Sequence, residues 1–156
     1  EIVILNYFMS CTDCDVLLCS PDGNPIRTTE GYCGNADMAL AGVKPEQIRS
    51  FIIPGGDISY INEASMHLFL QDLKQRNVLI AAICAGVNLL DDAGILRGIQ
   101  STHNMDLDIA NDQHVITARA NAYVDFAIET AKELDLFTDE EDLQETIAFW
   151  KYFKRA

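Results

Sequence analysis

The sequence predicts an α/β fold in which a mostly parallel sheet lies between two layers of helices, and three observations support this prediction. Short apolar runs of strand length occur early in the chain and again in its middle. These runs hardly alternate with polar residues, which is typical of strands buried on both faces of a parallel sheet. Segments with helical spacing separate the later runs, and that alternation favours a sheet covered by helices on both sides. The predicted strands are Ile2–Tyr7, Val16–Cys19, Phe51–Ile53, Val78–Ile83 and Val115–Ala118.

Helices are predicted where apolar residues recur at intervals of three and four, as they do from Met66 to Leu73. Asparagine precedes two of these segments as an N-cap, at Asn62 and Asn121, and Gly94 follows another at a C-cap position. The final segment has acidic residues at its start and basic residues at its end, which complements the helix dipole. The predicted helices run from Asn62 to about Arg76, from Gly86 to Ala93, from Asn121 to Leu134 and from about Asp139 to Lys154.

The connection between the first two predicted strands is short. Only residues 8–15 separate them, whereas a parallel crossover takes about a dozen residues or more. Either these strands are not parallel neighbours or, as we favour, a crossover helix is missing between about Met9 and Cys14. The sequence contains no repeat, low-complexity tract or linker, so residues 1–156 are predicted to form a single domain.

Composition and charge exclude several classes of protein. The chain has 24 acidic and 11 basic residues, a formal net charge of −13, which argues against a nucleic-acid partner or an anionic membrane surface. No apolar stretch approaches the length of about 20 residues that spans a bilayer, and the first residues do not resemble a signal peptide. Five cysteines, an odd number, favour free thiols and a cytoplasmic location. Cys11 and Cys14 have the spacing of a redox or zinc motif, but no second pair completes a metal site.

The most informative segment joins a buried strand directly to a helix at Cys84. Ala85 and Gly86 follow this cysteine, and such small residues allow a sharp turn and close packing of the helix on the sheet. This arrangement is typical of a nucleophile elbow, which presents a reactive side chain at the carboxyl edge of a sheet. A thiol at a helix N-terminus is expected to have a lowered pKa. We therefore predict that Cys84 is a nucleophile, although a buried, inert cysteine is the common alternative.

A second strand ends in Pro54-Gly55-Gly56. Glycines at this position allow backbone N–H groups to point into the crevice at the sheet edge. The N–H groups of Gly56 and Ala85 are therefore predicted to form an oxyanion hole.

Together these motifs resemble the ThiJ/PfpI superfamily of class I glutamine-amidotransferase-like proteins. The resemblance covers about Val16 to Leu136 and also includes the segments Leu89–Gly98, Thr102-His103 and Val115–Arg119. It implies a flavodoxin-like three-layer α/β/α sandwich, a homodimer and an oxidisable elbow cysteine. Activities in this superfamily include proteolysis or amidase chemistry, glyoxalase-type and deglycation chemistry, and redox-sensing or chaperone roles.

The resemblance assigns catalytic roles to Cys84 as nucleophile and His103 as the nearby histidine, the alternative for His103 being an ordinary polar residue. Protease-like members carry histidine directly after the cysteine, where this chain has Ala85, and this weakens a protease interpretation. The acidic partner of the cysteine is expected on the helix after the first strand, and we assign no residue to it. Around Arg119 the family often has Gly-Pro instead of the Ala-Asn that follows here, which predicts a different substrate loop.

Three functions remain open from the sequence. In the first, the Cys84 thiolate attacks a small-molecule or peptide substrate, in a hydrolase or amidase-like reaction or in a reactive-carbonyl (glyoxalase or deglycase) reaction, while His103 moves protons. In the second, a redox-responsive stress or chaperone-like protein uses the same cysteine as its oxidisable group. In the third, a binding module leaves Cys84 dispensable. Glutamine amidotransferase chemistry proper is not expected, because no His-x-Glu pair occurs, and we predict no cofactor and no metal.

Overall fold

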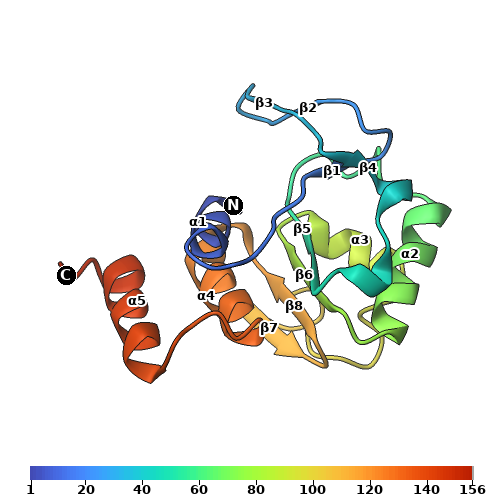
Figure 1. Cartoon of the computed structure of the whole chain (residues 1–156). Coiled ribbons are helices and arrows are strands. Elements are labelled where there is room, and N and C mark those ends of the chain that lie inside the picture. The colour runs from blue at the N-terminus through green and yellow to red at the C-terminus, as the bar shows by residue number, and fades with distance from the viewer. Residues whose placement is uncertain (156) are drawn as a thin grey trace.

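The computed structural model describes residues 1–155, and a four-stranded sheet forms the centre of the molecule (Figure 1). Its strand order is β5–β6–β8–β7. β5, β6 and β8 are parallel, whereas β7 pairs antiparallel with β8. All five residues of β6 are buried, which confirms the prediction of strands covered on both faces. The bounds are β5 Ser50–Ile53, β6 Leu79–Ile83, β7 Ile109–Asp112 and β8 Val115–Ala118.

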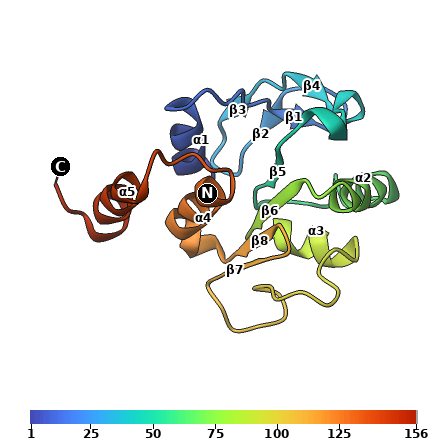
Figure 2. The same cartoon turned by 60° about the horizontal axis from the view of Figure 1, so that its bottom comes forward.

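Helices cover both faces of this sheet, so the predicted three-layer α/β/α architecture is confirmed (Figure 2). On one face, α1 (Val3–Ser10) and α4 (Tyr123–Glu133) pack against alternate residues of β6 such as Ala81 and Ile83. On the other face, α2 (Ala64–Gln75) and α3 (Gly86–Asp92) pack against the intervening residues of β6. Two apolar cores thus share one central strand.

A fifth helix, α5 (Glu140–Tyr152), lies outside the sandwich and packs against α4 (Figure 1). The carboxylate of Asp139 accepts a hydrogen bond from the backbone N–H of Asp142 at 2.9 Å and so caps the helix. The helix is held through aromatic contacts, including Trp150 against Phe8 with ring centroids 5.9 Å apart. The predicted helix and its acidic N-terminus are both confirmed.

The predicted strand at Ile2–Tyr7 is wrong, because these residues belong mainly to the helix α1. The buried residues of α1 are Leu5, Phe8 and Met9, whose spacing of three and four places them on one face toward α4. A short apolar run of this length does not distinguish a strand from a short buried helix. With a helix here, residues 11–18 only connect α1 to a strand, so the reason for expecting a missing crossover helix between Met9 and Cys14 disappears.

Residues 19–47 form short elements beside the main sheet. The strand predicted at Val16–Cys19 contributes only its last residue to β1. The pairs are β1 (Cys19–Ser20) with β4 (Met38–Ala39), parallel, and β2 (Ile26–Arg27) with β3 (Cys33–Gly34), antiparallel. Two 3₁₀ helices, η1 (Leu40–Gly42) and η2 (Pro45–Gln47), follow in this segment. A third, η3 (Ala120–Ala122), lies after β8 and completes the elements of residues 1–155.

The remaining predicted elements lie within two residues of the observed ones. Asn62, predicted as an N-cap, instead uses its side chain to bind Asp92 and His67, and Glu63 occupies the N-cap position of α2. Within residues 1–155, no helix is both long enough and apolar enough to cross a bilayer.

Candidate active site

Cys84 lies in a strained turn between β6 and α3. Its φ is +58°, in the left-handed region that a residue with a Cβ rarely adopts. Its backbone N–H donates to the carbonyl of Ala118 at 2.9 Å, and its carbonyl accepts from the N–H of Val87 at 3.1 Å. The turn is therefore fixed to β8 on one side and to the first turn of α3 on the other. The sharp strand-to-helix turn predicted at Cys84 is present.

Two glycines create the space that this turn requires. A Cβ on Gly86 would lie 2.7 Å from the carbonyl oxygen of Ile53 and 2.9 Å from that of Pro54, so the start of α3 packs against the end of β5. A Cβ on Gly55 would lie 2.7 Å from the Cβ of Cys84 and 2.6 Å from Oε2 of Glu1. Side chains at these positions would displace backbone in the first case and the thiol and carboxylate in the second.

The Glu1 carboxylate lies beside the Cys84 thiol. Oε2 of Glu1 accepts a hydrogen bond from the N–H of Gly55 at 2.7 Å. A Cβ on Gly55 would lie 2.6 Å from that oxygen and 3.0 Å from Sγ of Cys84, so the carboxylate and the thiol flank this glycine. The sequence alone gives no acidic partner for the cysteine, because the apolar run after Glu1 predicts a strand there. The helical spacing of Leu5, Phe8 and Met9, with a glutamate before it, is the signal that could have placed a carboxylate at the start of a helix.

The environment of Cys84 favours the protonated thiol. Burial raises the pKa of this thiol, and the hydrogen bond and negative charge of Glu1 raise it further, whereas the N–H of Ala85 lowers it. The net shift is upward, so the predicted lowering of the thiol pKa is wrong. The resting site therefore pairs a thiol with a neighbouring carboxylate that can accept its proton.

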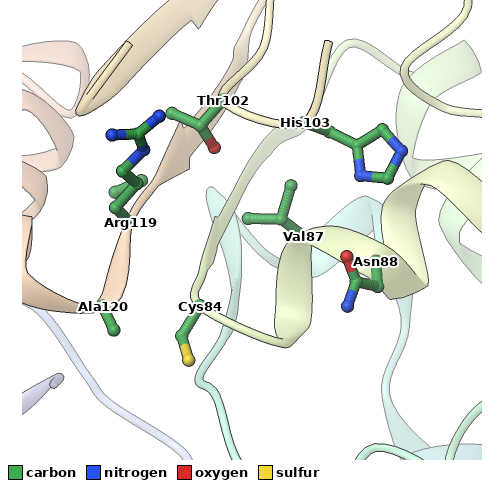
Figure 3. Close-up of a pocket in the computed structure, with 8 residues that line it drawn as sticks. Cys84, Val87, Asn88, Thr102, His103, Arg119 and Ala120 are labelled. Carbon is green, nitrogen blue, oxygen red and sulfur yellow. The ribbon is translucent and has the colours of Figure 1, made fainter. Parts of the chain in front are cut away.

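A cavity of about 320 Å³ adjoins this turn (Figure 3). Cys84 and His103 both line it, but Figure 3 shows the imidazole of His103 beyond Val87, with the Cys84 sulfur pointing away from it. Nε2 of His103 lies 3.2 Å from Oδ2 of Asp91. In residues 1–155, His103 forms no hydrogen bond with Cys84, so it belongs to the cavity wall rather than to the thiol's immediate surroundings. The lining residues are Cys84, Val87, Asn88, Thr102, His103, Ala118, Arg119 and Ala120.

The two predicted oxyanion donors lie on the loops around Cys84. The N–H of Ala85, at the start of α3, lowers the pKa of the Cys84 thiol. Gly56 has a φ of +121°, and its N–H finds no acceptor among the described residues. Gly55, which the sequence analysis did not select, contacts both the thiol and the carboxylate. All five cysteines are free, and residues 1–155 contain no group of three or more side chains placed to hold a metal ion.

Comparisons with known proteins agree with this architecture. A deglycase from Pyrococcus abyssi is 30% identical over 91 residues, which is 56% of this chain and 54% of that protein. A deglycase from Thermococcus kodakarensis is 28% identical over 102 residues, 62% of this chain and 61% of that protein. The chain therefore spans little more than half the length of the curated relatives that it matches.

Solved structures with the same fold extend over nearly the whole chain. A DJ-1 superfamily protein from Agrobacterium tumefaciens superposes with a TM-score of 0.85 at 24% identity, covering 99% of this chain and 92% of that one. The oxidised DJ-1 of Toxoplasma gondii gives a TM-score of 0.80 at 22% identity, covering 100% of this chain and 92% of that one. At these identities the likeness establishes the fold. The family model for the DJ-1/PfpI family matches residues 1–135, and the chain therefore belongs to the DJ-1/PfpI family.

Proposed function

We propose that this protein is an enzyme of the deglycase type, in which Cys84 attacks reactive carbonyl compounds or their adducts with amino groups. The observation that carries the proposal is the Glu1 carboxylate beside the Cys84 thiol in the turn after β6. A nucleophile with a base within reach is the basic unit of covalent catalysis. The deglycases among the relatives support a carbonyl adduct as the substrate.

The first chemical step needs only groups that the site holds. As Sγ of Cys84 attacks the carbonyl carbon, the thiol proton passes to the Glu1 carboxylate and a C–S bond forms. The π electron pair of the carbonyl moves to its oxygen, where the N–H groups of Ala85 and Gly56 can stabilise the negative charge. The resulting tetrahedral adduct is common to reactive carbonyls and to amides.

The Glu1 carboxylate beside Cys84 supports an enzyme over a redox sensor. Peroxide reacts with the thiolate, so a sensor cysteine works best when it is ionised at rest. Here burial and Glu1 hold the pKa of the thiol above its ordinary value. An enzyme avoids this limitation, because it removes the proton at the moment of attack on a bound substrate.

Turnover is the decisive measurement. Purified protein would be incubated with methylglyoxal and, in parallel, with methylglyoxal adducts of an acetylated amino acid, and both would be followed by chromatography. We expect many equivalents to be consumed per chain, and Cys84→Ser to reduce the rate by at least roughly 100-fold. Cys33→Ser is the matched control, because Cys33 is an exposed thiol outside the cavity.

Two results would overturn the proposal. In the first, wild type and Cys84→Ser consume the substrates at equal rates. In the second, the protein consumes no more than one equivalent and only peroxide modifies Cys84, which would assign the redox role instead.

We also propose that the protein works as a cytoplasmic homodimer on small-molecule or peptide substrates, without nucleic-acid or membrane partners. The net charge of −13 supports the absence of polyanionic partners. Sedimentation velocity at several protein concentrations tests the dimer, and a monomer at all concentrations would contradict it.

A further inference from the structure

Of the eight described residues that line the cavity beside Cys84, Arg119 alone carries a permanent charge. We infer that Arg119 binds a carboxylate of the substrate, so that the carbonyl compounds taken by this site are anionic. The inference rests on the proposed function, because it assigns a substrate class to the same cavity.

The backbone fixes Arg119 next to the reactive turn. Arg119 directly follows Ala118, the last residue of β8, whose carbonyl accepts the hydrogen bond from Cys84 at 2.9 Å. The N–H of Arg119 donates to the carbonyl of Asp108, also at 2.9 Å. Figure 3 shows Arg119 and His103 on opposite sides of the cavity, with Cys84 at its base on the β6–α3 turn. Arg119 and the nucleophile therefore line the same cavity from adjacent elements.

The present partners of the guanidinium are easily displaced. Arg119 pairs with Asp106, whose side chain is 94% exposed, and at 3.5 Å with Asp108, whose side chain is 72% exposed. Ion pairs between exposed side chains contribute little free energy, so a substrate carboxylate can replace Asp106 at small cost. His103, across the cavity, is already paired with Asp91 at 3.2 Å.

The guanidinium group suits a carboxylate. Its planar N–H donors match two carboxylate oxygens, which a lysine ammonium cannot do in the same way. The remaining lining residues are apolar or neutral, apart from His103. In a chain with a net charge of −13, Arg119 is the permanent cation that this cavity offers to an anion.

Matched alkylating reagents test the inference without requiring turnover. Iodoacetate and iodoacetamide differ in one charged group, as do the longer N-(2-carboxyethyl)maleimide and N-ethylmaleimide. The rate at Cys84 would be measured for each reagent by peptide mass spectrometry. The ratio of anionic to neutral rates at Cys84 would then be divided by the same ratio at Cys33, an exposed thiol on the same molecule.

We expect Arg119→Gln to lower this normalised ratio roughly fivefold for at least one of the two reagent lengths. Arg119→Lys should retain part of the preference. Asp106→Asn should raise the ratio, because it removes a competing carboxylate, and an almost fully exposed side chain can be changed without disturbing the fold. The inference is overturned if Arg119→Gln leaves the ratio unchanged at both lengths, or if Asp106→Asn fails to raise it.

These outcomes are separable from the fate of the proposed function. If turnover depends on Cys84 but the normalised alkylation ratio does not depend on Arg119, the enzymatic function is supported and the anionic substrate is rejected. If the normalised alkylation ratio depends on Arg119 but the protein shows no turnover, the anion subsite is supported and the enzymatic function is rejected. A Cys84 that is inert to all four reagents would overturn both.

Discussion

The two edges of the central sheet each hold a cavity, but they differ in the state of the groups that line it. At the amino edge the cavity is the larger, about 600 Å³ against about 320 Å³. Among its charged groups, Nδ1 of His114 lies 2.9 Å from Oε1 of Glu133, and the Arg49 guanidinium donates to the carbonyl of Leu134. At the carboxyl edge a thiol and a carboxylate lie together. The size of a cavity is therefore a poorer guide to a reactive site than the chemistry of the groups that line it.

The backbone differs between the edges in the same way. At the amino edge, Gln113 and His114 have positive φ values, as the two central residues of a tight hairpin between β7 and β8 commonly do. At the carboxyl edge, the positive φ of Cys84 falls between a buried strand and a helix. The first makes a turn, whereas the second presents a thiol to a cavity. Strain at the carboxyl edge is the kind that is concentrated at functional sites.

The strongest test of this contrast is Glu1→Gln, a change of similar shape that removes the base. We expect kcat/KM to fall about 100-fold, the lower end of what general base catalysis contributes. We also expect the pKa of Cys84 to fall, because the carboxylate that raises it has lost its charge. Iodoacetamide alkylation of Cys84, measured from pH 6 to pH 10, should therefore have its midpoint at a lower pH in the variant.

Opposite movements of turnover and thiol ionisation distinguish a base from a residue that merely supports the fold. If turnover falls and the alkylation midpoint stays unchanged or moves to higher pH, Glu1 does not act on Cys84 as described.

Gly86→Ala tests whether the close approach of α3 to β5 is required. The new Cβ would lie 2.7 Å and 2.9 Å from two backbone oxygens, and backbone cannot move as a flexible side chain can. We expect the free energy of unfolding to fall by about 1–3 kcal/mol, the usual cost of overpacking. Urea denaturation of the wild type and the variant measures this change in the free energy of unfolding. Gly42→Ala is the matched control, because nothing lies within 4 Å of a Cβ there. Equal effects of the two substitutions would show that the packing at Gly86 is not tight.

The parts of the fold that could be predicted from the sequence are those that depend on local pattern. β6 is a continuous apolar run, and such a run is typical of a strand buried on both faces. The turn at Cys84 follows from a strand that ends directly before Cys-Ala-Gly. Both signals are contained in a few consecutive residues.

The parts that escaped prediction depend on contacts between distant residues. Glu1 reaches the site through a hydrogen bond to Gly55, 54 positions away, and no local pattern records that contact. The upward shift of the Cys84 pKa could not be predicted for the same reason, since the sequence shows a helix start after the cysteine but not the carboxylate beside it. α1 was mistaken for a strand because eight mostly apolar residues can fit either element. The motif therefore located the site but did not describe its electrostatics.

His103→Gln is expected to have a smaller effect than Glu1→Gln. His103 lines the cavity, but its imidazole pairs with Asp91 and Figure 3 shows it away from the Cys84 sulfur. Loss of a half-exposed ion pair contributes up to about 1 kcal/mol, which corresponds to a change in kcat/KM of about fivefold or less. Steady-state kinetics across pH 5–9 checks this, with Asp91→Asn as the paired variant. A loss of about 100-fold would instead assign His103 the proton-transfer role that the sequence suggested.

The smallest effect is expected at the amino edge, from His114→Asn. This change removes the contact with Glu133, and both side chains are partly exposed, at 45% and 26%. The free energy of unfolding should fall by less than about 1 kcal/mol. Turnover and the alkylation of Cys84 should not change, because no group of this cavity reaches the carboxyl edge. Thermal unfolding and the methylglyoxal assay on the same preparation measure both quantities. A fall in turnover beyond the loss of folded protein would show that the two edges are coupled through the sheet. The edges would then differ in their chemistry but would not act independently of each other.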